Sequence, residues 1–496
     1  MRLRAPFLIV AITLVWPCAL HAQSASEFYR RGVDAYKAGN WDASIEAFDH
    51  VVNLEPKRAL AYSSRAQAKR AKNDLDGAIA DLDRAVELEP NDATHFAQRA
   101  SIRGQKGEIP AAVSDFDRAI ALDPKVPNTF RQRGSAKTSL QDFDGALADF
   151  DQAVALEPGN PLNFQIRADL NLKRKKFDAA IADLSAIIKL KPNDASAYAD
   201  RANVKAEKRD ALGALPDYDR AIALDSRNPV YALNRGRAFH ALKQWDRAIS
   251  EYSRAITLDP KLTLAHVNRG IARSAKQDYT GAIADFTQTI RLDPNFADAY
   301  FYRGGARMSV GDYEIAIRDF DWTITRNPQH ADAYANRGTA RFGKRDYAGA
   351  IADYTKCIRL NPQGADYVRF RLALILRKQG LDENPAGLTP SVNKWPDSWP
   401  KKVGLFLMGA TPESDLLKQA ALPGTKSVIE QQCEAYYYAG MVSLLKAEKK
   451  RAQELFEMAV ATRLSPYPEY SLSLFELGAL KNPPKDERLE QMKKRA

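Results

Sequence analysis

Arginine and aspartate recur along this 496-residue chain at spacings that favour ion pairs between helices. An arginine returns every 34 residues, a second cation follows four residues later in seven of ten intervals, and an aspartate follows sixteen residues later in eight. The arginines are Arg31, Arg65, Arg99, Arg133, Arg167, Arg201, Arg235, Arg269, Arg303 and Arg337. If each interval is an antiparallel helix pair, the carboxylate lies level with both cations of the other helix. We interpret the pattern as a structural ladder of ion pairs, with a cationic stripe for an anionic ligand as the alternative. The spacing does not decide whether each arginine pairs within its own interval or with the next one.

Residue types that could serve catalysis or metal binding lack the spacing that these functions need. No two histidines stand at the spacing of metal ligands on one helix face. They are His21, His50, His95, His240, His266 and His330. The chain also has no glycine-rich phosphate loop and no nucleophile-elbow serine. We therefore predict no enzyme activity, no metal and no cofactor. Cys357 stands where other intervals have alanine, which favours a core position, and a disulfide between Cys357 and Cys433 stays open.

The same 34-residue interval organises the apolar residues, so it defines the elements that position the charges. With position 1 at Ala25, position 8 is always glycine or alanine and position 24 is aromatic or leucine. Proline closes nine of the ten intervals, from Pro56 to Pro362. Small residues let two helices approach closely and the large residue fills the remaining space. Each interval therefore predicts a helix, a tight turn and a second helix.

These positions, repeated ten times between residues 25 and 362, resemble the tetratricopeptide repeat (TPR). The resemblance implies an all-α protein, a right-handed α-solenoid of ten tandem TPR helix hairpins with a helical C-terminal capping domain. It also implies that the first helix of each repeat lines a concave groove and that positions 2, 5, 6, 9 and 12 point into it. Repeat six departs from the pattern at Ala211, Pro216 and Ser226, so we expect the stack to be weakest there.

The groove positions change in character along the chain. Repeats two to six offer mostly small or polar residues, such as Ser63, Ala97, Ser101 and Ser135. Repeats seven to ten offer apolar residues and asparagines, and these form the predicted partner site. They are Leu233, Asn234, His240, Val267, Asn268, Ile271, Phe301, Tyr302, Met308, Asn336 and Phe342. Asparagine amides can bind the backbone of an extended peptide, although some of these side chains could instead pack against neighbouring helices.

The N-terminus has the features of a secretory signal peptide over residues 1–22: Arg2 and Arg4, an apolar run, and Ala22 before the expected cut. We therefore expect an exported, periplasmic protein. A lipid anchor at Cys18 is not expected, because Trp16 and Pro17 are too bulky for a lipidation site. No later segment is apolar enough for a transmembrane span. The net charge of +11 is largely explained by the ladder, so no nucleic-acid partner is predicted.

Beyond residue 362 the pattern predicts a partial repeat helix over 363–383, an irregular linker rich in proline and tryptophan over 384–400, and a helical C-terminal domain with one divergent TPR over 401–480. Residues 481–496 form a charged tail. The C-terminal region resembles that of a bacterial envelope TPR adaptor lipoprotein. The resemblance rests on Trp399, 405–409, Thr411, Leu416, Leu417, Glu434, 436–440, Ala452, Phe456, Ala459, Val460, Glu469, Tyr470, Glu476 and Leu477. It implies an adaptor that tethers a processing protease and peptidoglycan hydrolases.

The sequence therefore predicts a non-catalytic exported scaffold that binds protein partners or an extended peptide, in envelope assembly or peptidoglycan turnover. The alternative is an accessory subunit of a polysaccharide-export or glycan-modifying complex. Whether the groove or the C-terminal domain is the main binding site stays open.

Overall fold

The structure, a computed structural model, describes residues 16–382, 387–423, 427–464 and 467–481. Regular structure in these ranges is entirely α-helical, which confirms the predicted all-α fold of stacked helix hairpins. Most of the predicted signal peptide and nearly all of the predicted charged tail lie outside the described residues.

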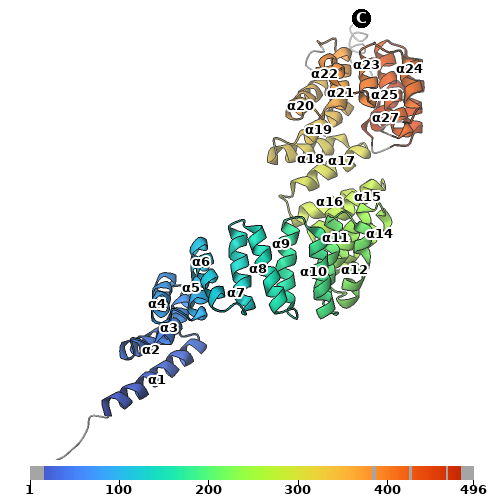
Figure 1. Ribbon diagram of the computed structural model, residues 1–496. Coiled ribbons are helices and arrows are strands. Elements are labelled where there is room, and N and C mark those ends of the chain that lie inside the picture. The colour runs from blue at the N-terminus through green and yellow to red at the C-terminus, as the bar shows by residue number, and fades with distance from the viewer. Residues whose placement is uncertain (1–15, 383–386, 424–426, 465–466, 482–496) are drawn as a thin grey trace, which may run out of the picture. The chain divides into compact units, whose positions relative to one another are not determined.

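Ten helix hairpins follow one another from residue 16 to residue 360 (Figure 1). The first helices are α1 (Trp16–Lys37), α3 (Ala59–Ala71), α5 (Ala93–Lys106), α7 (Pro127–Ser139), α9 (Pro161–Lys173), α11 (Ala195–Glu207), α13 (Pro229–Ala241), α15 (Thr263–Ala275), α17 (Ala297–Ser309) and α19 (Ala331–Gly343). The second helices are α2 (Trp41–Leu54), α4 (Leu75–Leu88), α6 (Ile109–Leu122), α8 (Phe143–Leu156), α10 (Phe177–Leu190), α12 (Ala211–Leu224), α14 (Trp245–Leu258), α16 (Tyr279–Leu292), α18 (Tyr313–Arg326) and α20 (Tyr347–Leu360).

Each hairpin is closed by contact between a small and a large residue. A Cβ atom on Gly134 would lie only 2.5 Å from a ring carbon of Phe150, which is itself buried. The same contact recurs sixteen residues apart in Gly304 and Phe320, and again in Gly440 and Phe456 near the C-terminus. The glycine therefore sets how closely the two helices approach, as the repeat pattern predicts.

The turns between the two helices also follow one scheme. The residue at position 15 takes a left-handed conformation, with φ of 91° at Gly107 and 57° at Lys175. In several repeats an aspartate then caps the second helix, as Asp142 does by accepting from the Gly145 N–H over 3.0 Å. These local interactions fix where each second helix begins.

The chain divides into two compact units, Met1–Leu224 and Asp225–Ala496, and the division falls at the end of repeat six. Within each unit, the second helix of a repeat packs on the first helix of the next repeat. Pro216 lies inside α12, which nevertheless continues to Leu224.

Within the described residues, seven helices follow the last regular repeat: α21 (Asp366–Lys378), α22 (Leu388–Lys394), α23 (Trp399–Leu407), α24 (Glu413–Ala420), α25 (Val428–Leu445), α26 (Lys449–Ala461) and α27 (Pro468–Lys481). The expectation that residues 384–400 form an irregular connection is wrong for α22 and for the start of α23. Pro390 and Pro400 lie in the first turns of these helices, where a missing N–H breaks no helical bond. Val392 and Trp399 are buried in the C-terminal core, which explains why this segment is ordered as helix.

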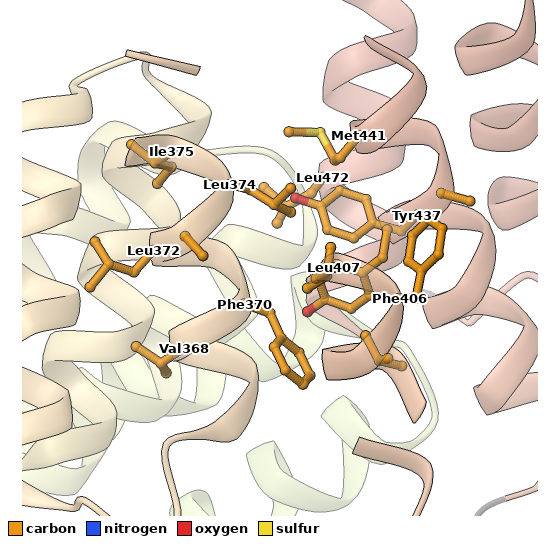
Figure 2. Close-up of a cluster of buried hydrophobic side chains, with 14 of the residues drawn as sticks. Val368, Phe370, Leu372, Leu374, Ile375, Phe406, Leu407, Tyr437, Met441 and Leu472 are labelled. Atoms are coloured by element: carbon orange, nitrogen blue, oxygen red, sulfur yellow. The ribbon is translucent and has the colours of Figure 1, made fainter. Parts of the chain in front are cut away.

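Helix α21 is buried on every side, since all residues from Val368 to Leu376 are at most 8% exposed. Its apolar residues face side chains from α23, α25 and α27, including Phe406, Tyr437 and Leu472 (Figure 2). A helix that is apolar all round needs neighbours on all its faces. The C-terminal helices provide these neighbours for the last repeat.

Candidate functional site

The charged residues of the repeats form the predicted ladder, and each aspartate at position 23 pairs with cations of its own repeat. Asp115 accepts from Arg99 over 2.6 Å (Nη2 to Oδ1) and from Arg103 over 2.7 Å (Nη1 to Oδ2). It is 5% exposed, so the charges neutralise one another away from water. Burial opposes the charge of Arg99, but its hydrogen bonds to Asp115 and Asp83 outweigh that effect and raise its pKa.

All seven repeats with a second cation at position 11 form the second ion pair as well. These pairs are Lys69–Asp81, Arg103–Asp115, Lys137–Asp149, Lys205–Asp217, Arg273–Asp285, Arg307–Asp319 and Arg341–Asp353. The structural interpretation of the ladder is therefore supported by geometry, and the pairing within each repeat is settled.

The sequence analysis missed that the same arginine also reaches the preceding repeat. Arg133 Nη1 lies 2.7 Å from Asp117 Oδ1, at position 25 of the repeat before it. Where position 25 carries a hydroxyl, as at Ser185, that oxygen accepts instead, over 2.9 Å from Arg201 Nη1. The recurring aspartate, serine or threonine at position 25 was the available signal. The arginines of repeats two to six and of repeats eight to ten therefore each join two consecutive repeats.

Three of the predicted groove residues are buried, which corrects their assignment to a binding surface. Leu233 and Val267 are 4% and 5% exposed, and Phe342 is 3% exposed. Leu233 belongs to a core cluster with Ala265 and Ala272 of the next repeat. The side chains of Leu233 and Val267, both at position 5, are thus buried instead of entering the groove.

Phe342 is covered by α27, the last helix of the described residues. Its ring centroid lies 6.4 Å from that of Phe475 on α27, and Lys378 Nζ lies 6.0 Å from the Phe342 centroid. Position 12 of repeat ten is therefore occupied from within the chain, and the accessible part of the groove stops before it.

The other apolar groove residues keep part of their surface exposed. Phe301 lies beside His330 at a centroid separation of 4.7 Å, and Tyr302 stacks on Phe286 at 5.7 Å. Tyr302 is 37% exposed, Met308 and His240 are half-buried, and burial lowers the pKa of His240. These side chains form an aromatic surface that is partly packed and partly open.

The asparagines at position 6 are half-buried on the first helices α13, α15 and α19. The Asn268 and Asn336 amides form no side-chain hydrogen bond within the part of the chain that the structure describes. Their donors and acceptors are therefore available to a ligand.

Cavities in the first unit lie along the repeats whose groove positions carry mostly small or polar residues. One cavity of about 340 Å³ is lined by residues from α3, α5 and α7, among them Gln67, Gln98 and Gln132. The side-chain oxygens of Gln98 and Gln132 are buried there without a hydrogen-bond partner. A neighbouring cavity is lined by Ser101, Ser135 and Ile166.

The conspicuous residues of the C-terminal region form a buried polar network. Glu469 on α27 accepts from Arg371 over 2.7 Å and from Tyr438 over 2.9 Å. Glu434 on α25 accepts from Trp399 and from Tyr367, each over 2.7 Å. These carboxylates have partners in the core, so they are structural groups.

Arg371 occupies the arginine position of a further repeat, and its partner comes from 98 residues along the chain. Lys378 pairs with Glu476 across the same two helices, at 3.4 Å. Since both pairs run in the same order, α21 and α27 are parallel, as consecutive first helices are in a repeat stack.

Cys357 and Cys433 are free thiols. Both are buried, and burial raises the pKa of each to about 11. Among the described helices, none combines the length and apolar character that a membrane crossing requires.

Comparison with known proteins identifies the repeats. A model described as "Tetratricopeptide repeat" matches residues 29–93, 98–161, 131–195, 166–229, 267–309 and 306–365, and one described as "TPR repeat" matches residues 236–277. Tetratricopeptide repeat protein 36 of Bos taurus is 43% identical over 47 residues, which cover 10% of this chain and 25% of that protein. The chain thus spans about a quarter of the length of this relative.

Solved structures of repeat proteins are also similar. YrrB, described as a TPR protein with an unusual peptide-binding site, matches with 21% identity and a TM-score of 0.35, over 40% of this chain and 98% of that chain. The C-terminal part of a TPR repeat-containing protein from Cytophaga hutchinsonii matches with 18% identity and a TM-score of 0.41, over 55% of this chain and 98% of that chain. The family models cover more than half of the chain, and such repeats indicate a protein-interaction scaffold. The chain belongs to the tetratricopeptide repeat family.

Proposed function

We propose that this protein is a non-catalytic scaffold that holds an extended segment of a partner protein along the first helices of repeats seven to ten. The observation that carries the proposal is the pair of unoccupied amides on α15 and α19, Asn268 and Asn336. An amide offers a donor and an acceptor, so it can bind a peptide backbone whatever the peptide sequence.

The exposed apolar side chains support the same site. Tyr302, Phe301, Met308 and His240 stand on the first helices between or beside the asparagines, and each retains accessible surface. Partly exposed side chains near the Asn268 and Asn336 amides suit a peptide with hydrophobic side chains. Leu233, Val267 and Phe342 contribute to this site only by supporting the helices.

We further propose that the protein acts outside the cytoplasm and that its partners are envelope proteins. The signal-like sequence of residues 1–22 supports this location. The resemblance of the C-terminal region to an envelope adaptor points to a processing protease or a peptidoglycan hydrolase. Recovery of a polysaccharide-export or glycan-modifying enzyme in the test below would favour the alternative function.

A photo-crosslinking residue at Tyr302 tests the site in the cells that make the protein. We expect a covalent adduct with an envelope protein, mapped to one contiguous peptide. The matched control places the same residue at Leu212, which is exposed on a second helix. An equal adduct at Leu212, or none at Tyr302, would contradict the proposed groove.

A further inference from the structure

Two carboxylates and one histidine converge where repeat two meets repeat three. His95 Nε2 lies 3.1 Å from Glu89 Oε2 and 3.8 Å from Asp92 Oδ2. One potential ligand atom from each residue lies within 4.8 Å of the others. Histidine spacing does not predict this cluster, because two of its three potential ligands are carboxylates.

The backbone holds these residues in place. Glu89 is the residue that ends α4, and Asp92 caps the start of α5 by accepting from the Thr94 N–H over 2.7 Å. This bond uses one Asp92 oxygen and leaves the other turned towards His95. His95 is fixed in the first turn of α5, with its side chain 4% exposed.

The negative charge of this cluster is not balanced by a lysine or an arginine. No lysine or arginine of the described residues forms an ion pair with Glu89 or Asp92. The corresponding glutamate two repeats later, Glu157, pairs with Arg131 at 3.1 Å. At the position of that arginine, repeat two has Ser63. Asp123 lines the same open cavity as Glu89 and Asp92, which adds a third acidic group.

The histidine ring also lacks a complete set of partners. Nδ1 is buried and has no hydrogen-bond partner. If the proton is on Nε2, the Nδ1 lone pair is unsatisfied. If the proton is on Nδ1, the Nε2 lone pair faces two carboxylates and is repelled by their negative charge. A cation bound among the three groups would attract all of them.

We propose that Glu89, Asp92 and His95 bind a zinc ion. Imidazole nitrogen and carboxylate oxygen are both ordinary zinc ligands, at about 2.0–2.2 Å from the metal. Tetrahedral ligands at that distance lie about 3.4 Å apart, between the two separations seen around Nε2. The open cavity that Glu89, Asp92 and Asp123 line would give an ion and its water access to these carboxylates. A bound ion would tie the end of α4 to the start of α5 and so stabilise the junction of repeats two and three.

Calorimetric titration of the untagged full chain with ZnCl2, after treatment with EDTA, tests the site. We expect saturable binding of one ion at this site and a melting temperature that rises with zinc concentration, whereas MgCl2 gives neither. Glu89→Gln, at a half-exposed residue that the fold does not need, and His95→Asn should each weaken zinc binding by at least about tenfold.

The matched control is His266→Asn, which changes another buried histidine whose Nε2 faces the Pro260 carbonyl oxygen at 3.1 Å. This variant should bind zinc as the wild type does. The proposal is overturned if the wild type does not bind zinc, if Glu89→Gln binds it undiminished, or if His266→Asn loses it equally.

Discussion

Arg167 donates from Nη2 to Asp183 Oδ1 of its own repeat over 2.5 Å. Nη1 of the same guanidinium also lies 2.7 Å from Asp151 Oδ1 in the preceding repeat. Position 11 of this repeat is Asn171, whose amide lies 3.4 Å from Asp183, so Arg167 is the principal cation for a buried carboxylate. The ladder thus carries both the closure of a hairpin and its connection to the one before it.

Replacing Arg167 by methionine should lower the free energy of unfolding by about 3 kcal/mol, because Asp183 is left buried without its cation. Chemical denaturation followed by circular dichroism measures the change. The control is Arg318→Met on α18, whose side chain is 70% exposed and meets Glu314 only at 3.9 Å. Equal losses in the two variants would show that the ladder does not stabilise the stack.

A second prediction concerns the buried charges of the C-terminal core. Burial raises the pKa of Glu469, but the charge and hydrogen bond of Arg371 outweigh this and lower it from its ordinary value of 4.5. The folded pKa is depressed, so this stabilisation is fully present above pH 4.5 and is lost as the pH falls through the lowered value. Acid titration followed by tryptophan fluorescence should therefore report loss of the C-terminal core below that pH.

Glu469→Gln should lower the stability of the C-terminal core by about 3–5 kcal/mol at neutral pH, because Arg371 is then buried without a counter-charge. The variant should also lose part of the acid transition. Glu457→Gln provides the control, since Glu457 is half-exposed and meets Lys481 only at 3.8 Å. A neutral-pH stability of Glu469→Gln equal to that of the control would disprove the role of this pair.

Repeat six is expected to open locally more readily than its neighbours. Pro216 has no N–H to donate within α12, and Ala211 replaces the large residue that starts most other second helices. Hydrogen exchange should show weaker protection over residues 210–226 than over the matching residues 278–294 of repeat eight. Uniform protection would remove repeat six as a weak point.

The repeat architecture could be predicted because it depends on residues close together in the sequence. Gly134 and Phe150, or Arg99 and Asp115, are sixteen residues apart and belong to one hairpin. The sixteen-residue spacing is therefore enough to predict both contacts. The bond from Arg133 to Asp117 could also have been inferred, since position 25 is regularly acidic or hydroxylated.

The parts that the sequence did not predict depend on long-range packing. The pair of Arg371 and Glu469 joins residues 98 positions apart, after helices that break the repeat. The burial of Phe342 depends on Phe475 of the same distant helix. The burial of Leu233 depends on how closely the next repeat packs against its own. The position of a residue within the repeat does not predict this distance.

The affinity of the crosslinked partner peptide for groove variants tests the central claim most directly. The double variant Asn268→Ala, Asn336→Ala should weaken binding by roughly 1–3 kcal/mol, the net value of one or two hydrogen bonds, with an unchanged melting temperature. The double variant Gln98→Ala, Gln132→Ala removes amides from the same position in repeats three and four and should leave the affinity unchanged. If the glutamine changes weaken binding and the asparagine changes do not, or if only deletion of residues 365–496 abolishes it, the groove of repeats seven to ten is not the binding site.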